Sequence, residues 1–360
     1  MKKKVVVACG GTGGHVFPGL VVANLLQQKG HDVTVWLSGR AIESASESSW
    51  KGATFSTGAR QLSVATLPQL VLSVLRCFFA MRAQKPDVVL AMGSYSSLPP
   101  VLVAWLLRIP VVLHEANAVP GKAVEFLSRF ATVTAISFDE AKNWLHGRCV
   151  EKTGLPVRLS LLGKEPFDEI PENQFVIFVT GGSQGAHRVN QLVVQAMTLL
   201  KQDGIDDVFV IHQSGAADEE WVRETYEKAG VKAKVAPFIR EMGRAFASAD
   251  LVICRAGAST CFELALVRKP ALLIPLPTAL RDHQHLNAVE MVRNGGADEG
   301  IQRELTGRSL MRYIANKKSN PASLEKMRAA YGSMNVAEAG LRLVELVERT
   351  ARAPSAHGTP

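Results

Sequence analysis

The chain has 360 residues, of which 47% are hydrophobic and 21% are charged, and this composition excludes a disordered or fibrous protein. At roughly 150 residues per domain, the length predicts two domains, each large enough to bury its own core. The formal net charge of +8 falls entirely in the first part, because residues 1–158 hold 17 basic and 9 acidic side chains, whereas residues 159–335 hold 21 of each. This asymmetry indicates an anionic partner for the first half, such as nucleic acid, a phosphate-bearing substrate or an acidic membrane, with a merely solvated basic surface as the alternative.

The cysteines are five in number, widely spaced and never arranged as a CxxC pair. This usage disfavours a disulfide framework and a zinc site, and it fits a reducing cytoplasm. The Lys-rich start followed by apolar residues is similar to a secretory signal. However, the apolar run ends after Cys9 at a Gly-rich turn, so we expect a first β-strand there instead.

The first half alternates between predicted strands and helices. Short apolar runs predict strands at 5–9, 32–39, 87–94, 110–117 and 133–137, and helices are expected over 18–30, 98–108 and 122–130. Such alternation is typical of a parallel sheet covered by helices on both faces, with the functional loops at the carboxyl ends of the strands.

Residues 67–85 form an unusual segment, apolar nearly all round for about three turns and interrupted by Arg76, Arg82 and Lys85. The segment is too short and too often interrupted to span a bilayer, which needs about 20 apolar residues. One interpretation is an ordinary buried helix. The other is a partly exposed apolar patch with a basic rim, lying in the interface of an anionic membrane.

After a Pro- and Gly-rich stretch at 154–173, the same plan starts again. Residues 175–197 repeat the order of strand, glycine turn and helix, so GGSQGAH at 181–187 corresponds to GGTGGH at 10–15, and four more strand-like runs follow. We therefore predict two Rossmann-like domains facing each other across a cleft, with domains at 1–158 and 159–335. A last helix at 336–352 is expected to pack back onto the first domain.

The turn at 10–14 presents backbone N–H groups at a helix N-terminus and therefore predicts an anion site. It is not the dinucleotide fingerprint, because Val16 stands where G-x-G-x-x-G requires glycine, and no acidic residue ends the second strand. His15 follows the turn, where the positive helix end favours a neutral imidazole that could take a proton from a hydroxyl. A purely structural histidine that ties the turn is the alternative.

Residues 254–266, CRAGASTCFELAL, lead from a strand through a turn into a helix. Thr260 and Glu263 have the spacing of a capping box, which would need no function. The functional alternative is that the backbone of 258–260 receives a diphosphate while Glu263 accepts hydrogen bonds from ribose hydroxyls.

Residues 281–288, RDHQHLNA, carry amide side chains, Gln284 and Asn287, that suit sugar hydroxyls because an amide both donates and accepts. His283 and His285 lack a nearby third ligand for zinc, and no Asp-x-Asp pair is present. We therefore expect no metal and no other cofactor.

Eight segments occur in the order found in the MurG family. They are GGTGGHVFPG, DVVLAMGSYSSLP, PVVLHEANAVPG, TGLPVR, VTGGSQGAHRVN, VIHQSG, ICRAGASTCFE and DHQHLNA. The resemblance to these bacterial N-acetylglucosaminyltransferases of peptidoglycan synthesis runs from about residue 5 to residue 350. It implies a GT-B fold, peripheral attachment to the cytoplasmic face of the membrane and no obligatory metal. It also implies inverting transfer of GlcNAc from UDP-GlcNAc to the 4-hydroxyl of MurNAc in undecaprenyl-pyrophosphoryl-MurNAc-pentapeptide.

The resemblance also implies the site residues. The donor contacts would be Thr12, Gly13, Gly14, Asn117, Arg158, Ser183, Ile239 through its backbone, Ala258, Ser259, Thr260, Cys261, Phe262, Glu263 and Gln284. The acceptor diphosphate would meet Gly11, Gly93, Ser94, Tyr95 and Ser96. His15 is the first candidate for the general base and Glu115 the second.

Simpler roles stay open for several of these residues. Arg158 could form a surface ion pair, Ser183 could cap its helix and Tyr95 could pack in the interior. Glu115 could organise the loop after its strand. Asn117 could be a plain turn amide and Gln284 a plain amide on a helix surface. For the whole chain the rivals are another GT-B sugar-nucleotide enzyme, such as an epimerase or a soluble glycosyltransferase, and a non-catalytic UDP-sugar-binding membrane tether. Nucleic acid is disfavoured as a partner because no binding motif accompanies the charge, and cell-wall synthesis proteins are possible partners.

Overall fold

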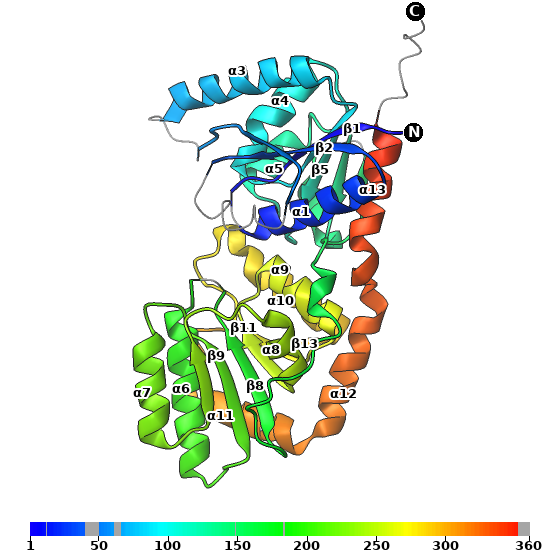
Figure 1. The fold of residues 1–360 in the computed structure, drawn as a ribbon. Coiled ribbons are helices and arrows are strands. Elements are labelled where there is room, and N and C mark those ends of the chain that lie inside the picture. The colour runs from blue at the N-terminus through cyan, green and yellow to red at the C-terminus, as the bar shows by residue number, and fades with distance from the viewer. Residues whose placement is uncertain (12, 40–49, 61–65, 148, 183, 352–360) are drawn as a thin grey trace, which may run out of the picture. The chain divides into compact units, whose positions relative to one another are not determined.

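The computed structural model describes residues 1–11, 13–39, 50–60, 66–147, 149–182 and 184–351. The chain divides into two compact units, of which the first comprises Met1–Arg158 with the C-terminal segment from Val336, and the second Leu159–Asn335. Each unit holds one sheet of parallel strands with helices on its faces (Figure 1). The predicted α/β class is therefore confirmed.

The sheet of the first unit has seven strands in the order β3-β2-β1-β4-β5-β6-β7. Their bounds are β1 Lys4–Ala8, β2 Asp32–Leu37, β3 Ala53–Ser56, β4 Val88–Ala91, β5 Val111–Glu115, β6 Val133–Ile136 and β7 Val150–Lys152. The strand order reverses between β1 and β4, and ligands of such sheets bind beyond the carboxyl ends of the strands at this point. The sequence did not predict the short edge strands β3 and β7, because ATFS and VEK carry no apolar run.

Alternate residues of β1 face opposite layers of helices. Val5 and Val7 pack in one core with α1 (Gly13–Gln28) and α13 (Ala339–Thr350). Val6 and Ala8 pack in another with α3 (Leu67–Gln84), α4 (Leu98–Leu106) and α5 (Lys122–Leu127). This two-residue period is that of a strand buried on both faces.

Helix α1 begins earlier than predicted. It starts at Gly13, within the glycine turn itself, so Pro18 lies inside the helix rather than near its start. Gly13 and Gly14, together with His15, form the first turn of the helix. The first N–H groups of α1 consequently belong to the loop that was expected to bind an anion.

The sheet of the second unit has six strands in the order β10-β9-β8-β11-β12-β13. Their bounds are β8 Phe175–Thr180, β9 Val208–Gln213, β10 Ala233–Ala236, β11 Leu251–Cys254, β12 Ala271–Leu273 and β13 Ala297–Glu299. The helices are α6 His187–Gln202, α7 Glu219–Ala229, α8 Met242–Ser248, α9 Ala258–Val267, α10 His283–Asn294, α11 Gly307–Ser319 and α12 Pro321–Ala330. Ile177 and Val179 face α6, α7, α11 and α12, whereas Phe178 packs edge-on against Phe246 of α8.

Short 3₁₀ turns complete the described chain. They are η2 Tyr95–Ser97, η3 Asp139–Trp144, η4 Leu159–Leu161, η5 Leu280–Asp282, η6 Tyr331–Met334 and η7 Val336–Glu338.

Helix α3 buries only one narrow stripe, Ser73, Cys77 and Met81. Its large apolar side chains are 48% to 68% exposed and form what we name the α3 patch: Leu67, Val71, Leu72, Leu75 and Phe79. The interpretation as an ordinary buried helix is therefore wrong, and the exposed patch is confirmed. In the described part of the chain, no helix is long and apolar enough to cross a membrane.

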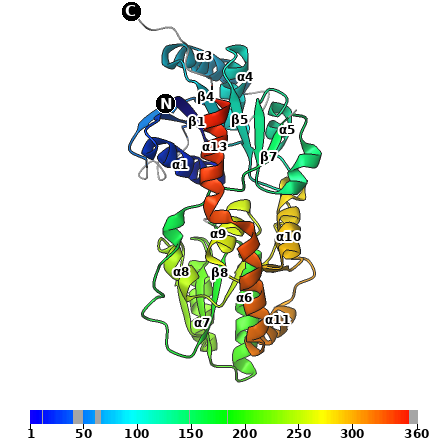
Figure 2. The same cartoon turned by 90° about the vertical axis from the view of Figure 1, so that its right-hand side faces the viewer.

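Helix α13 lies beside α1 although more than 300 residues separate them in sequence (Figures 1 and 2). Leu343 and Val344 are fully buried in the core that contains β1. Glu348 forms an ion pair with Lys29 at 3.0 Å, and its other carboxylate oxygen is hydrogen-bonded to His31 Nε2 at 2.9 Å. The last helix thus completes the first unit.

Candidate functional site

In the first unit, the loops after β1 and β4 are in direct contact. A Cβ placed on Gly11, whose φ is +115°, would lie only 2.6 Å from Ser94 Oγ. The Ser96 hydroxyl donates to the Gly10 carbonyl at 2.6 Å. The structure therefore brings together Gly11, Ser94 and Ser96, three of the residues expected on the acceptor side.

Gly93 lies beside His15. A Cβ on Gly93 would be 3.5 Å from His15 Cδ2 and 3.1 Å from the His114 carbonyl oxygen. Gly93 has a φ of +86° and Ser94 one of +69°, and positive φ at a serine is a strained conformation that recurs at functional sites. The candidate base thus lies against the turn that begins η2 at Tyr95.

Glu115, at the end of β5, is 3% exposed. Its Oε1 accepts from the Asn117 N–H at 2.8 Å and from Asn117 Nδ2 at 3.2 Å, and its Oε2 accepts from the Gly121 N–H at 3.3 Å. Burial raises the pKa of Glu115 to about 7, although the hydrogen bonds from Asn117 and Gly121 oppose that rise. Glu115 therefore organises the loop that carries Asn117.

His114 is a buried neighbour that the sequence did not single out. Its side chain is fully buried, and its Nε2 donates to the Gly154 carbonyl at 3.1 Å. Burial lowers the pKa of His114 to about 4, so the imidazole is neutral at pH 7. In the sequence, the only feature that could have drawn attention to His114 was its position next to Glu115 at the end of a predicted strand.

Arg158 and Gly13 meet at Phe17, which was also missed. The Arg158 guanidinium lies 4.9 Å from the centre of the Phe17 ring, a cation–π geometry. A Cβ on Gly13 would be 3.3 Å from the same ring. Arg158 is thus held beside the first turn of α1, which also contains Gly14 and His15.

In the second unit, α9 starts at Ala258 with Gly257 as its N-cap and no side-chain cap. The interpretation of Thr260 and Glu263 as a capping box is therefore wrong, because both residues lie inside the helix. Helical geometry leaves the N–H groups of 258–260 without partners within α9, whereas Cys261 N–H donates to Gly257 O. Cys261 and Phe262 are buried, whereas Ser259, Thr260 and Glu263 are partly exposed.

Helix α10 follows two residues with left-handed backbone, Arg281 and Asp282. Gln284 Oε1 accepts from the Leu276 N–H at 3.0 Å. Asn287 is fully buried, and its Nδ2 donates to the Ala256 carbonyl at 3.1 Å. The expectation that Asn287 binds sugar is therefore wrong, since its amide ties α10 to the loop before α9.

The two histidines of α10 have separate protein partners. His285 pairs with Glu299 at 2.6 Å, and His283 contacts the Leu280 carbonyl at 2.9 Å. Among the residues that the structure describes, no three His, Cys, Asp or Glu side chains are grouped closely enough to hold a metal ion.

Ile239 lies at the loop after β10 and is 4% exposed. Its N–H donates to Gln213 Oε1 at 2.9 Å. Its carbonyl is therefore the backbone group that could accept a hydrogen bond from a base. Gln213, at the end of β9, was missed by sequence reasoning, and Thr12 and Ser183 lie outside the described residues.

Comparisons with known proteins agree along nearly the whole chain. Residues 5–136 match the family model described as the glycosyltransferase family 28 N-terminal domain, and residues 176–342 match that of the C-terminal domain. A Myxococcus xanthus (strain DK1622) protein is 36% identical over 357 residues, covering 95% of this chain and 92% of its own. It is named UDP-N-acetylglucosamine--N-acetylmuramyl-(pentapeptide) pyrophosphoryl-undecaprenol N-acetylglucosamine transferase.

Two solved structures illustrate the fold. MurG of Acinetobacter baumannii has a TM-score of 0.79 at 30% identity, covering 97% of this chain and 100% of that one. A UDP-GlcNAc 2-epimerase from Neisseria meningitidis, bound to UDP-GlcNAc, has a TM-score of 0.74 at 14% identity, covering 96% of this chain and 100% of its own. The second likeness shows a shared fold alone, and together with the first it confirms the predicted GT-B class.

Proposed function

Because this chain belongs to glycosyltransferase family 28, we propose that it moves GlcNAc from UDP-GlcNAc to the 4-hydroxyl of MurNAc in undecaprenyl-pyrophosphoryl-MurNAc-pentapeptide. The observation that carries this proposal is the 36% identity, over 95% of the chain, to a transferase named for that reaction. The product is the disaccharide-linked lipid precursor of peptidoglycan, with inversion at the anomeric carbon.

In the second unit we assign the donor to the amino end of α9. The N–H groups of Ala258, Ser259 and Thr260 would receive the diphosphate, and Glu263 would accept from the ribose hydroxyls. The Ile239 carbonyl would accept from the uracil N3–H. Backbone amides at a helix N-terminus suit this task because they balance negative charge without a metal.

Further donor contacts complete this assignment. Gln284 would bind the sugar hydroxyls. The remaining contacts are assigned to Thr12, Gly13, Gly14, Asn117, Arg158 and Ser183. Support for Arg158 comes from its guanidinium, which Phe17 holds beside the first turn of α1.

On the acceptor side we assign the lipid diphosphate to the joined loops at Gly11 and Gly93–Ser96, with Tyr95 along it. His15 would take the proton from the 4-hydroxyl as the oxygen attacks the anomeric carbon. The bond from that carbon to the UDP oxygen breaks on the opposite face, and donor-side amides stabilise the charge that grows on UDP. Glu115 ranks second as the general base, because its carboxylate oxygens already accept hydrogen bonds from its own loop.

We further propose peripheral attachment to the cytoplasmic face of the membrane through the α3 patch. Its apolar side chains are exposed, and Arg76, Arg82 and Lys85 lie along the same helix and at its end. Apolar side chains with a basic rim suit the interface of an anionic bilayer. Contacts with other cell-wall synthesis proteins stay a prediction.

Incubation of the purified protein with radiolabelled UDP-GlcNAc and a short-chain lipid-linked MurNAc-pentapeptide tests the reaction. We expect label in the lipid fraction only when acceptor is present. An epimerase would instead convert the sugar nucleotide without acceptor, and a non-catalytic tether would bind it unchanged. Absence of label from the lipid would overturn the proposed function.

A further inference from the structure

Gln213 uses both ends of its buried amide. The residue ends β9 and is 3% exposed. Its Nε2 donates to Thr180 Oγ1 at 3.1 Å and to the Gly182 carbonyl at 3.0 Å, while its Oε1 accepts from the Ile239 N–H at 2.9 Å. Because two donors and one acceptor are all engaged, the amide has a single satisfactory orientation.

These bonds connect loops from three neighbouring strands. In the sheet β9 lies between β8 and β10. Thr180 is the last residue of β8, Gly182 follows that strand, and Ile239 follows β10. Thr180 Oγ1 also accepts from the Gly182 N–H at 3.1 Å. Gly185 and Gly215 bring the backbones together, since a Cβ on Gly185 would lie 2.2 Å from the Ser214 carbonyl oxygen. The described parts of these loops, residues 180–182, 184–187, 213–218 and 236–239, are therefore packed against one another.

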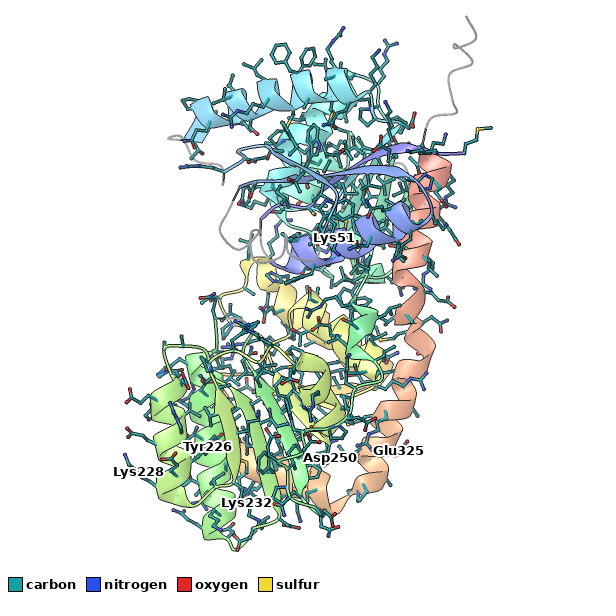
Figure 3. The ribbon with its side chains drawn as sticks, in the orientation of Figure 1. Lys51, Tyr226, Lys228, Lys232, Asp250 and Glu325 are labelled. Atoms are coloured by element: carbon teal, nitrogen blue, oxygen red, sulfur yellow. The ribbon has the colours of Figure 1, made fainter. Side chains whose placement is uncertain are left out.

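A second buried network fixes the residues on either side of Gln213. Tyr226 of α7, labelled in Figure 3, donates to His212 Nδ1 at 2.9 Å, and His212 Nε2 donates to Asn190 Oδ1 at 3.1 Å. Asn190 Nδ2 then donates to the Ser214 carbonyl at 2.8 Å and to Asp218 Oδ2 at 2.7 Å. With His212 and Ser214 both held, the Gln213 side chain has little freedom to move away from its partners.

We infer that Gln213 is a positioning residue for the sugar nucleotide, setting the separation between the glycine loop at Gly182 and the base-facing backbone at Ile239. This inference rests on the proposed function, which assigns Ser183, beside Gly182, and Ile239 to the donor. Gln213 acts through these two segments and is itself buried. Its contribution is to keep both ends of the donor site ready before UDP-GlcNAc binds, which lowers the ordering cost of binding.

The variant Gln213→Glu separates positioning from general structural support. A carboxylate accepts from Ile239 but cannot donate to the Gly182 carbonyl, so the glycine loop is released. Burial favours the protonated carboxyl as pH falls, and its O–H restores one donor. At pH 8, calorimetric titration of Gln213→Glu with UDP-GlcNAc should give a Kd roughly tenfold or more above that of wild type. At pH 5.5, the Kd of the variant should lie closer to that of wild type.

Gln202→Glu is the matched control, because Gln202 is exposed at the end of α6 in the same unit. It should bind UDP-GlcNAc like wild type at both pH values. If Gln213→Glu does not fold, Thr180→Val carries the test, since it removes one partner of Nε2 and should raise Kd a few-fold.

The outcomes are distinguishable. Wild-type affinity in Gln213→Glu, or in Thr180→Val where that variant carries the test, would overturn the inference alone. So would a loss in Gln213→Glu that is equal at pH 8 and pH 5.5, because it indicates damage unrelated to the missing donor. Failure of the wild-type protein to bind UDP-GlcNAc would overturn the proposed function and this inference together.

Discussion

At the scale of single residues, His15 and Glu115 have different surroundings. His15 lies beside Gly93 in the first turn of α1, whereas the Glu115 carboxylate binds its own loop. We therefore expect His15→Ala to lower kcat by about 10²–10⁴-fold, the usual contribution of a general base, with little change in the Kd of UDP-GlcNAc. Steady-state kinetics and calorimetry measure the two quantities. His146→Ala, at a half-exposed histidine of the same unit, is the control, and a kcat for His15→Ala within tenfold of wild type would exclude His15 as the base.

Glu115 gives a second prediction through its pKa of about 7. The carboxylate form holds the Asn117 loop, and it is lost as pH falls through 7. The value of kcat/KM should therefore decline below about pH 7, and Glu115→Gln, which has no ionisable group, should lose that decline while starting from a lower plateau. A pH profile from 5.5 to 8.5 checks this. An unchanged decline in Glu115→Gln would mean that another group controls it.

How much of the site was predictable differs from residue to residue. The glycines at 10–14 were found because turns between strands and helices carry strong signals, whereas Gly93 was named only through the resemblance to the MurG family. Gln213 was not, since its partners Thr180 and Ile239 lie 33 and 26 residues away and nothing local marks them. Asn287 was misjudged because the sequence does not reveal which face of α10 is buried.

At the scale of elements, α3 shows where pattern alone was insufficient. Its residues are apolar nearly all round, so periodicity could not distinguish a buried helix from an exposed one. Likewise, Thr260 and Glu263 matched a capping box, but the N-cap of α9 is Gly257, three residues before Thr260. The strands β1, β4 and β5 were predicted well because long apolar runs leave fewer alternatives.

The exposed face of α3 predicts membrane attachment. Leu72→Glu combined with Phe79→Glu should reduce flotation with anionic vesicles, because charge replaces apolar contact, while activity on a soluble acceptor persists. Gln69→Glu with Ala83→Glu adds the same charge at exposed positions outside the α3 patch and should reduce flotation less. If both double variants lose the same amount of flotation, the change in charge alone explains the loss. If Leu72→Glu with Phe79→Glu floats like wild type, the α3 patch is not part of the attachment surface.

At the scale of the whole molecule, the two units draw on different parts of the chain. The first is completed by α13, whose Leu343 is fully buried with α1 and β1, whereas Leu341 on the same helix is 45% exposed. Leu343→Ala should destabilise the first unit by about 2–5 kcal/mol, and Leu341→Ala should change it little. Hydrogen exchange measured by mass spectrometry should show faster exchange in α1 and β1 but not in β8 and β9. Equal acceleration in both units would contradict an assignment of α13 to the first.

The position of α13 also bears on the order in which the protein matures on the ribosome. The segment up to Arg158 is translated first, yet its core stays open until Leu343 and Val344 have been added. At a synthesis rate of about 5–20 residues per second, this delay is on the order of ten to forty seconds. During that time residues 159–335 of the second unit are translated, while the side of α1 that packs against α13 stays uncovered. We therefore expect the first unit to finish folding only after the second has been translated, and to expose apolar surface in that interval.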